Sequence, residues 1–378
     1  FSNFGTITEY LETRYNSKFL RSASAFLSMV ALIALVGSQV GAAVGIMNAL
    51  GMKNTTIAAL FACIVIIALT SMGGLMAVTV TDGFQIILVM VGVVWITVAA
   101  LGDIGGLSGL NASLTAIQSE LPEGYNVFMD SEKFKSLLWM ILPGLMYIMI
   151  GQDIYQRLFA CKDHKTAIKA SVCSAVLVCI VSVMPVTLGL IARVKHPELA
   201  TAGTSAAAFA TIAMSTLPGW AVGIIIAAAL SAIFSTADSC LSAAASHFMT
   251  DLYLPYIGKN VDTKDRRLVT ISRAFTVIAG LAAVGVSMLL PTILDGCFYA
   301  YYIYTSGVFC PIVFGVFWKK ATKQGAIAGL LAGGLFMMYA LLTGFSVAGI
   351  GGELLSGIVS AIVLVVVSLA TQPKKTAA

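Results

Sequence analysis

Long apolar runs separated by short charged segments set the pattern of this chain. Ten stretches contain no charged residue, and most of them reach the roughly 20 residues that a helix needs to cross the hydrocarbon core of a membrane. These uncharged stretches are 22–52, 54–81, 83–102, 136–152, 170–192, 199–237, 274–294, 296–318, 324–352 and 354–373. Their hydrophobicity is continuous rather than alternating, which favours helices over the strands of a barrel. The pattern predicts an all-α, polytopic helical membrane protein with about ten transmembrane helices, in a single transmembrane domain over residues 1–378.

Composition agrees with a lipid environment. Of the 378 residues, 59% are hydrophobic and 10% are charged, whereas soluble domains carry roughly 25% charged residues. The net charge of +5 predicts no nucleic-acid partner, because in a membrane protein the placement of the positive charges decides their meaning. If residues 1–21 are cytoplasmic and each stretch crosses once, seventeen of the 22 lysines and arginines fall in inside loops. We therefore expect a multi-pass protein of the cell (plasma or inner) membrane, with both ends of this chain cytoplasmic.

Residues suited to enzymatic or metal chemistry are sparse. The seven cysteines form no CxxC pair and the three histidines are scattered, so we predict neither a disulfide framework nor a metal centre, and no enzyme nucleophile. No organic cofactor is expected. The chain begins with Phe1 and shows no signal sequence before the first span, which leads us to expect that upstream sequence is missing.

Helix breakers inside the apolar stretches point to places where a membrane protein can line a cavity, since irregular backbone is tolerated there. Pro143-Gly144 is predicted to interrupt a helix over 136–156 near its middle, and Pro311 lies inside the stretch 296–318. A simple packing kink is an equally good interpretation of each. Tyr147 falls just after the first break, where an aromatic ring is suited to cover a substrate.

One carboxylate lies deep in an apolar stretch, where an ionisable group costs roughly 2.5–3.5 kcal/mol and therefore indicates a function. It is Asp238, the only charged residue between Glu198 and Asp251. On a helix it would border a face lined with oxygen atoms, formed by Ala232, Ser235, Thr236 and Ser239. Hydroxyls and carbonyls are the ligands that a hard cation such as Na⁺ prefers. The alternative is that each hydroxyl bonds only to its own helix.

Two further groups of residues are candidates for binding. Asp82, at the start of an uncharged stretch, is either a second carboxylate for a cation or a helix N-terminal carboxylate stabilised by the dipole. Tyr299 and Tyr302 share one helical face, which suits either a cavity lining or an aromatic belt at the membrane surface. The candidate substrate contacts are Tyr147, Gln39, Tyr299 and Tyr302. Gln152, Asp153, Gln156 and Arg157 are interpreted as a polar anchor near the cytoplasmic end of their helix.

Several motifs, in order over almost the whole chain, resemble the sodium:solute symporter family. They are Glu12-Thr-Arg-Tyr15, Gly73-Gly74 with Ala77, Thr81-Asp82 and Gln85, Gln156-Arg157-Leu-Phe-Ala-Cys-Lys162, Ser235-Thr-Ala-Asp-Ser239, Thr250-Asp-Leu-Tyr253, Gly315-Val-Phe-Trp-Lys-Lys320 and Gly325-Ala-Ile-Ala-Gly329. The resemblance implies the inverted five-helix-repeat (LeuT-type) fold with a site at the membrane midplane. The matching segments begin just before the third core helix, so the first two core helices would be missing.

The resemblance also assigns roles to individual residues. It implies a Na⁺ site in which Ala232 offers a carbonyl and Ser235 and Thr236 offer hydroxyls. Asp82, Asp238 and Ser239 match a second cation site of some family members, and Tyr147 falls where relatives place an aromatic beside the substrate. Near the proline that many members carry in the tenth helix, this chain has Ser306 instead.

The function expected from the resemblance is a sodium-coupled secondary active symporter that imports a small organic solute by alternating access. Its partners would be Na⁺, the solute and the lipid bilayer, with no obligate protein partner. The solute stays open, because the Ala-Asp-Ser run is similar to a choline-type branch and the Ser-Thr pair to a proline branch. Proton coupling through Asp82 or Asp238 is the main alternative, since burial raises the pKa of a carboxyl group. A channel is a further alternative, which the scarcity of intramembrane charges disfavours.

Overall fold

The computed structural model describes residues 4–121, 131–200, 204–258, 261, 265–290, 292–347 and 350–372. These residues are all-α, as predicted, apart from one two-stranded antiparallel ribbon. The α-helices are α1 (Ile7–Tyr15), α2 (Lys18–Ala49), α3 (Thr55–Asp103), α4 (Gly106–Ala116), α5 (Ser131–Ile148), α6 (Gln152–Phe159), α7 (His164–Val181), α8 (Val183–Lys195), α9 (Ala208–Thr216), α10 (Gly219–His247), α11 (Leu254–Tyr256), α12 (Arg266–Leu289), α13 (Ile293–Phe317), α14 (Lys323–Thr343) and α15 (Gly352–Ala370). The short elements are the 3₁₀ helices η1 (Gln118–Glu120), η2 (Pro197–Ala200) and η3 (Ser205–Ala207), the π-helix η4 (Phe248–Tyr253), and strands β1 (Ser346–Val347) and β2 (Ile350–Gly351).

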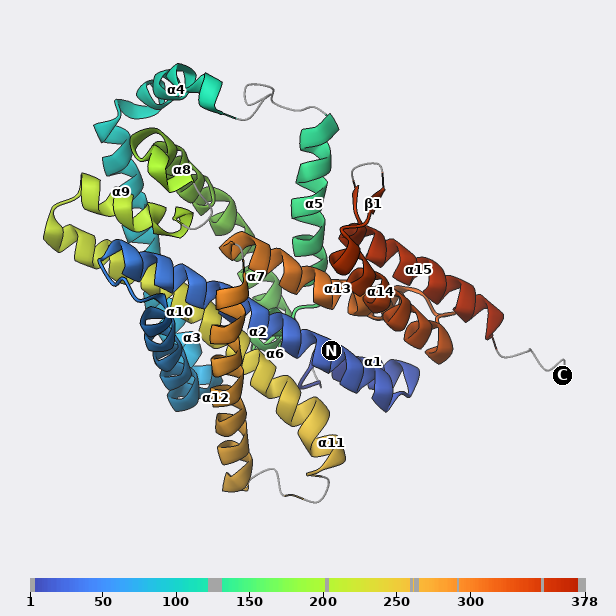
Figure 1. Ribbon diagram of the computed structural model, residues 1–378. Coiled ribbons are helices and arrows are strands. Elements are labelled where there is room, and N and C mark those ends of the chain that lie inside the picture. Colours follow the sequence, from blue (N-terminus) through green and yellow to red (C-terminus); the bar gives the residue numbers. More distant parts are fainter. Residues whose placement is uncertain are drawn as a thin grey trace, which may run out of the picture.

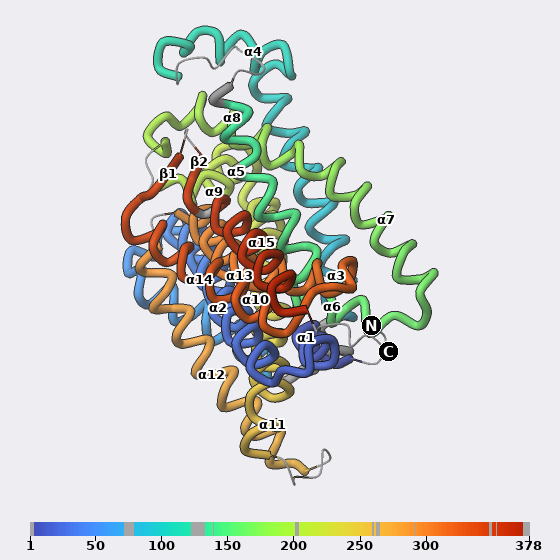
Figure 2. The backbone as a smooth tube through the Cα atoms, turned by 90° about the vertical axis from the view of Figure 1, so that its right-hand side faces the viewer, coloured from blue at the N-terminus to red at the C-terminus, as the bar shows by residue number. Residues whose placement is uncertain are grey.

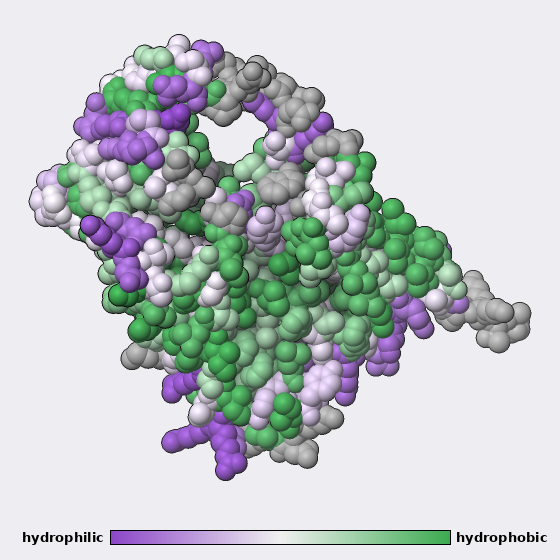
Figure 3. Space-filling model, in the orientation of Figure 1, coloured by the Kyte–Doolittle hydropathy of each residue, from purple (hydrophilic) through white to green (hydrophobic). Residues whose placement is uncertain are grey.

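Helices suited to cross a membrane dominate this fold. Within the described residues, eight are long and apolar enough: Lys18–Ala49, Thr79–Asp103, Lys133–Phe159, His164–Lys195, Gly219–Tyr256, Arg266–Leu289, Ile293–Phe317 and Lys323–Thr343. Two shorter apolar segments, Thr55–Ser71 and Leu354–Ala370, lie in two further predicted stretches, and the first of them is the beginning of the continuous helix α3. The surface is apolar across the middle and hydrophilic towards both ends (Figure 3), as lipid contact requires.

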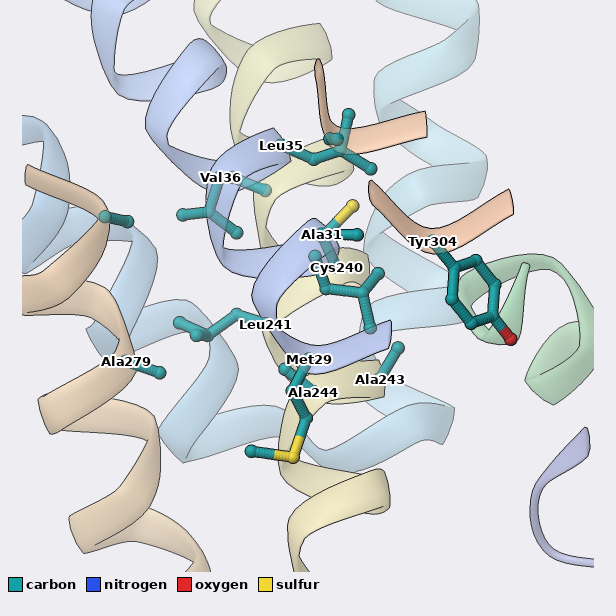
Figure 4. Close-up of a cluster of buried hydrophobic side chains, with 14 of the residues drawn as sticks. Met29, Ala31, Leu35, Val36, Cys240, Leu241, Ala243, Ala244, Ala279 and Tyr304 are labelled. Carbon is teal, nitrogen blue, oxygen red and sulfur yellow. The ribbon is translucent and has the colours of Figure 1, made fainter. Parts of the chain in front are cut away.

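Helix α2 lies at the centre of the bundle and packs against α3, α10, α12 and α13 (Figure 1). The buried side chains between these helices include many small ones, among them Ala31, Ala243 and Ala279 (Figure 4). Small residues let membrane helices approach closely, because packing rather than the hydrophobic effect drives their association in lipid. At the periphery, α7 runs along the outside of the bundle with no buried residue (Figure 2).

Local sequence explains where several helices begin. The Asp163 carboxylate accepts a hydrogen bond from the Thr166 amide at 2.8 Å and caps α7. This bond favours the ionised form, so it lowers the pKa of the Asp163 carboxyl group. Asn54 caps α3 in the same way through the Ile57 amide, at 3.1 Å.

Asp82 does not begin a helix, in contrast to the interpretation as an N-terminal carboxylate. Helical structure continues from Thr55 to Asp103, a run of 49 residues. Inside a helix the backbone amides are already bonded, so the helix dipole provides no free partner for a carboxylate. The charge of Asp82 must therefore be balanced by another part of the chain.

The predicted break at Pro143-Gly144 is wrong in position. Helix α5 continues through Pro143 to Ile148, because a proline removes a single hydrogen bond that a packed helix tolerates. The interruption comes at Gly151, between α5 and α6. A Cβ atom at this residue would lie 2.9 Å from both a ring carbon of Tyr147 and a carboxylate oxygen of Asp153, so a larger residue here would displace these two side chains.

Candidate cation and substrate site

The turn between α5 and α6 carries an aromatic cluster. The Tyr147 carbonyl accepts hydrogen bonds from the amides of Ile150 and Gly151, at 3.0 and 2.7 Å, which closes the turn. The Tyr147 side-chain hydroxyl donates a hydrogen bond to a carboxylate oxygen of Asp153 at 2.8 Å. The ring centroid lies 4.7 Å from that of Tyr301 and 6.1 Å from that of Tyr304. Tyr147 is 4% exposed and therefore closes over the turn in this conformation.

Next to this cluster lies a cavity of about 330 Å³ between α3, α6 and α10. Each helix contributes oxygen or nitrogen atoms to its wall. Its polar lining is Asp82 and Gln85 from α3, Asp153 and Arg157 from α6, and Ser235, Thr236 and Ser239 with Ala232 from α10. The structure thus brings the predicted Na⁺ ligands of α10 together with Asp82, more than 140 residues away in sequence.

The hydroxyls of α10 bond back to their own helix. Ser235 Oγ and Thr236 Oγ1 each donate to the Ala232 carbonyl at 3.1 Å, and Ser239 Oγ donates to the Ser235 carbonyl at 2.9 Å. This matches the alternative weighed from the sequence. It does not exclude cation binding, because a hydroxyl that donates its hydrogen keeps two lone pairs as acceptors. The Ala232 carbonyl, by contrast, already receives two hydroxyl donors.

One cation faces the carboxylates of the cavity wall. Arg157 Nη2 donates to Asp82 Oδ2 at 2.7 Å and also to the Ser239 hydroxyl. Asp238 lies outside the lining, 5% exposed. Its Oδ1 has no hydrogen-bond partner among the described residues, and the side chain of Thr70 lies beside the carboxylate. Of the three residues in the predicted second cation site, Asp82 and Ser239 therefore line the cavity and Asp238 lies beside it.

The other predicted substrate contacts lie elsewhere. Tyr302 is 2% exposed and packs with Phe298 and Met337. Gln39 and Tyr299 are partly buried and do not line the 330 Å³ cavity. The aromatic partners of Tyr147 on α13 are Tyr301 and Tyr304 instead.

Sequence reasoning missed Asp153 and Arg157 as members of the site. Both were interpreted as a cytoplasmic polar anchor, yet both line the cavity. Their spacing of four residues, which places them on one helical face, was the available signal. Gln85, three residues after Asp82, carries the same signal and also lines the cavity.

Comparisons with known proteins identify relatives of the whole chain. The family model described as "Sodium:solute symporter family" matches residues 2–333. A sodium/glucose cotransporter of Vibrio parahaemolyticus is 30% identical, covering 88% of this chain and 66% of its own length. A sodium/pantothenate symporter of Haemophilus influenzae is 28% identical over 90% of this chain and 69% of its own. A sodium/proline symporter of Escherichia coli is 26% identical, covering 93% of this chain and 72% of its own length. This chain therefore spans about two thirds of the length of these relatives.

A solved structure shares the fold. It is the substrate-bound, outward-open state of a Na⁺-coupled sialic acid symporter, and it superposes with a TM-score of 0.78. The match covers 98% of this chain and 78% of the other, at 19% sequence identity. The arrangement of helices is therefore shared over nearly the whole chain.

Proposed function

The chain belongs to the sodium:solute symporter family, and on this basis we propose that it couples the entry of Na⁺ to the import of a small organic solute. The observation that carries the proposal is the polar cavity between α3, α6 and α10, whose wall contains Ser235 and Thr236 together with Asp82. Such a cavity suits a small hard cation, whose ligands are oxygen atoms. Relatives of this chain named in the comparisons are sodium symporters or cotransporters.

In this proposal, Na⁺ binds to the hydroxyl lone pairs of Ser235 and Thr236, and backbone carbonyls or water complete its shell. The solute binds beside Tyr147. Asp153 links the two, because its carboxylate lines the cavity and accepts the Tyr147 hydroxyl at 2.8 Å. A cation near Asp153 stabilises the carboxylate that holds Tyr147 in place. Na⁺ binding and solute binding then favour each other through a shared coupling free energy, typically 1–3 kcal/mol.

Transport in proteoliposomes tests the proposal directly. The natural full-length protein is reconstituted and given an inward Na⁺ gradient with labelled glucose, pantothenate or proline, the solutes named for its relatives. Uptake of at least one should depend on Na⁺ and stop when choline replaces Na⁺. A matched set of vesicles carries a pH gradient without Na⁺. Uptake driven by that gradient alone would favour the proton-coupled alternative and contradict Na⁺ coupling.

The membrane orientation is part of the same proposal. We expect α4 outside and the start of α12 inside, since the loop before α12 is rich in lysine and arginine. Cysteines introduced one at a time at Ser108 and Arg267 report on the two sides, in a background where all seven native cysteines, of which Cys173 and Cys179 are exposed, are replaced by serine. An impermeant thiol reagent added outside intact cells should label position 108 only. Labelling of position 267 alone would reverse the orientation.

A further inference from the structure

A second polar cavity lies further along α10, where this helix and η4 meet α12 and the first half of α3. Its volume is about 570 Å³, and its wall shares no residue with the 330 Å³ cavity around Ser235 and Thr236. Helix α11 and the start of α12, which border it, lie together at one end of the molecule, at the bottom of Figure 1 and Figure 2. In the orientation proposed above, this end faces the cytoplasm.

Hydroxyl groups that have no partner line this cavity. Seven of its lining residues are serines or threonines. In a membrane helix such a hydroxyl commonly donates to a carbonyl of its own helix, as Ser239 does in the other cavity. Four hydroxyls of this wall form no hydrogen bond with any residue that the structure describes, namely those of Ser71, Ser242, Ser246 and Ser272. They are therefore available as donors to a group that enters the cavity.

The wall also carries one positive charge and no negative one. Arg273 of α12 is the one charged residue among the described residues that line the cavity. Its guanidinium forms no hydrogen bond or ion pair with the described part of the chain. Arg266 lies on the same face of α12, two turns earlier. Asp251, the carboxylate next to the lining residue Thr250, is fully buried and does not reach the wall. The cavity therefore favours an anion.

The chemistry of the donors indicates a phosphate group. A guanidinium and several hydroxyls suit an anion whose oxygens each accept a hydrogen bond. The rest of the wall is largely apolar and includes Met249, Leu254, Leu268 and Val269. A free phosphate ion makes no use of these side chains, whereas the glycerol and first acyl carbons of a phospholipid pack against them. Basic pockets between membrane helices at the cytoplasmic side are suited to anionic lipid head groups.

We propose that this cavity binds the phosphate group of an anionic phospholipid, drawn from the leaflet in which α12 begins. Arg273 pairs with the phosphate, and the four serines donate hydrogen bonds to its oxygens or to the hydroxyls of the head group. A lipid with a head-group ammonium fits less well, because the wall offers that ammonium an arginine and no carboxylate. The bound head group connects α12 to α3 and α10. The inference is independent of Na⁺ coupling.

Native mass spectrometry tests the proposal. The natural full-length protein is purified in a non-ionic detergent and titrated with phosphatidylglycerol, and the occupancy of the first bound lipid is followed. Arg273→Gln should raise the lipid concentration for half-occupancy by about tenfold or more, because the phosphate loses its charged partner. Phosphatidylcholine, which has the same phosphate and a head-group ammonium, should bind the native protein more weakly than phosphatidylglycerol does.

A second variant keeps the test decisive if Arg273→Gln fails to fold. Ser242→Ala combined with Ser246→Ala removes two donors from the wall and keeps good helix formers. This double variant should raise the phosphatidylglycerol concentration for half-occupancy a few fold. Phosphatidylglycerol that binds the native protein and both cavity variants equally would overturn the proposal.

Arg267→Gln is the matched control. Arg267 is an exposed arginine at the same end of α12 and does not line the cavity, so its loss should leave half-occupancy unchanged. Equal weakening by Arg267→Gln and Arg273→Gln would indicate attraction to surface charge in general and overturn the proposal. Millimolar inorganic phosphate should not displace the lipid. If it did, the cavity would be a site for the free ion instead.

Discussion

Helix α10 and the π-helix η4 that follows it carry two polar regions about four turns apart, and the two differ in how their carboxylates are satisfied. In the first region, around Asp251, every neighbour is a donor. Thr6 and Thr8 donate to its two oxygens at 2.8 and 2.7 Å, Arg21 Nε lies 2.7 Å away, and so does His247 Nδ1. Asp251 is 0% exposed. We call these five residues the Asp251 cluster.

In the second region, the cavity around Ser235 and Thr236, the carboxylates are only partly satisfied. Asp82 has one cationic partner, Arg157, and Asp238 has an oxygen without a partner among the described residues. The wall encloses about 330 Å³ of open space. A buried carboxylate whose two oxygens are both bonded, such as that of Asp251, is held in one conformation, whereas a partly satisfied carboxylate leaves room for an exchangeable ion.

Helix α6 links the two regions. At its start, Gln152 Oε1 accepts from the Ile7 amide of α1 at 3.0 Å, and its Nε2 donates to the Gly5 carbonyl at 3.2 Å. One turn later, Arg157 contacts α3 and α10. A movement of α6 at the Gly151 turn must therefore break contacts with α1, next to the Asp251 cluster, and contacts in the cavity around Ser235 and Thr236. The residues of the Asp251 cluster therefore stabilise the fold, whereas the residues that line the cavity are suited to bind and release ligands.

The largest expected effect is on stability, after a substitution in the Asp251 cluster. Asp251→Asn removes one of the charges that balance Arg21, whose side chain is 12% exposed and also pairs with Glu12 at 2.7 Å. Because the buried donors around position 251 then lose hydrogen bonds to a charged acceptor, the free energy of unfolding should fall by about 2–3 kcal/mol. Denaturant unfolding in detergent measures it. The Na⁺ affinity of the folded fraction should not change, and an Asp251→Asn protein as stable as the native one would remove the distinction between the regions.

Substitutions in the cavity should give the opposite pattern. Ser235→Ala and Thr236→Ala each remove a ligand while keeping a good helix former, so stability should hold. The Na⁺ concentration for half-maximal uptake should rise about fivefold or more, since coupling free energies of 1–3 kcal/mol are typical. Thr97→Ala is the control, because Thr97 also donates to its own helix, at 2.7 Å, but lies outside the cavity. Unchanged Na⁺ dependence in both variants would reduce these hydroxyls to packing groups.

Sequence reasoning reached the family, the all-α membrane class and the α10 face, all of which rest on local information. Apolar stretches reveal membrane helices directly. The residues of the α10 face fall on one side of a single helix, so their spacing suffices to group them. The family and the fold class are confirmed, whereas the roles of Ser235 and Thr236 stay predictions.

The parts that sequence reasoning missed depend on contacts between distant segments. Whether Asp153 and Arg157 face a cavity depends on the direction of α6 after the turn at Gly151, which no periodicity encodes. The Asp251 cluster joins Thr6 to a residue 245 positions away, and the sequence shows it only as separate motifs. The position of the helix break was also missed: α5 continues through Pro143, and the chain turns at Gly151, beside Tyr147 and Asp153.

A smaller effect is expected at the aromatic cluster between the regions. Tyr147→Phe removes the hydrogen bond to Asp153, and the net value of such a bond is about 1 kcal/mol, so half-saturation for the solute should rise a few fold. Tyr147→Ala should raise the solute concentration for half-saturation much further. The Na⁺ concentration for half-saturation should rise less. Tyr304→Phe is the matched control, since its hydroxyl donates to the Ile150 carbonyl at 3.0 Å and its loss should lower stability instead. Equal effects of Tyr147→Ala on solute and Na⁺ would favour a packing role.

The smallest effect should come from an ion pair that belongs to neither region. Lys195 Nζ lies 3.2 Å from Asp103 Oδ2, and the two side chains are 28% and 42% exposed. Water and salt screen such a pair, and holding two flexible side chains in one geometry offsets part of the attraction, so its coupling free energy should be about 0.2–1 kcal/mol. A double-mutant cycle of Asp103→Asn and Lys195→Gln, read from denaturant unfolding, measures it, and the coupling should shrink further in about 1 M salt. The same cycle on Asp251→Asn and Arg21→Gln should give a larger value that salt hardly changes, because that pair is buried. If the exposed pair coupled as strongly as the buried one, burial would not be what distinguishes the Asp251 cluster, and its rigidity would need another cause.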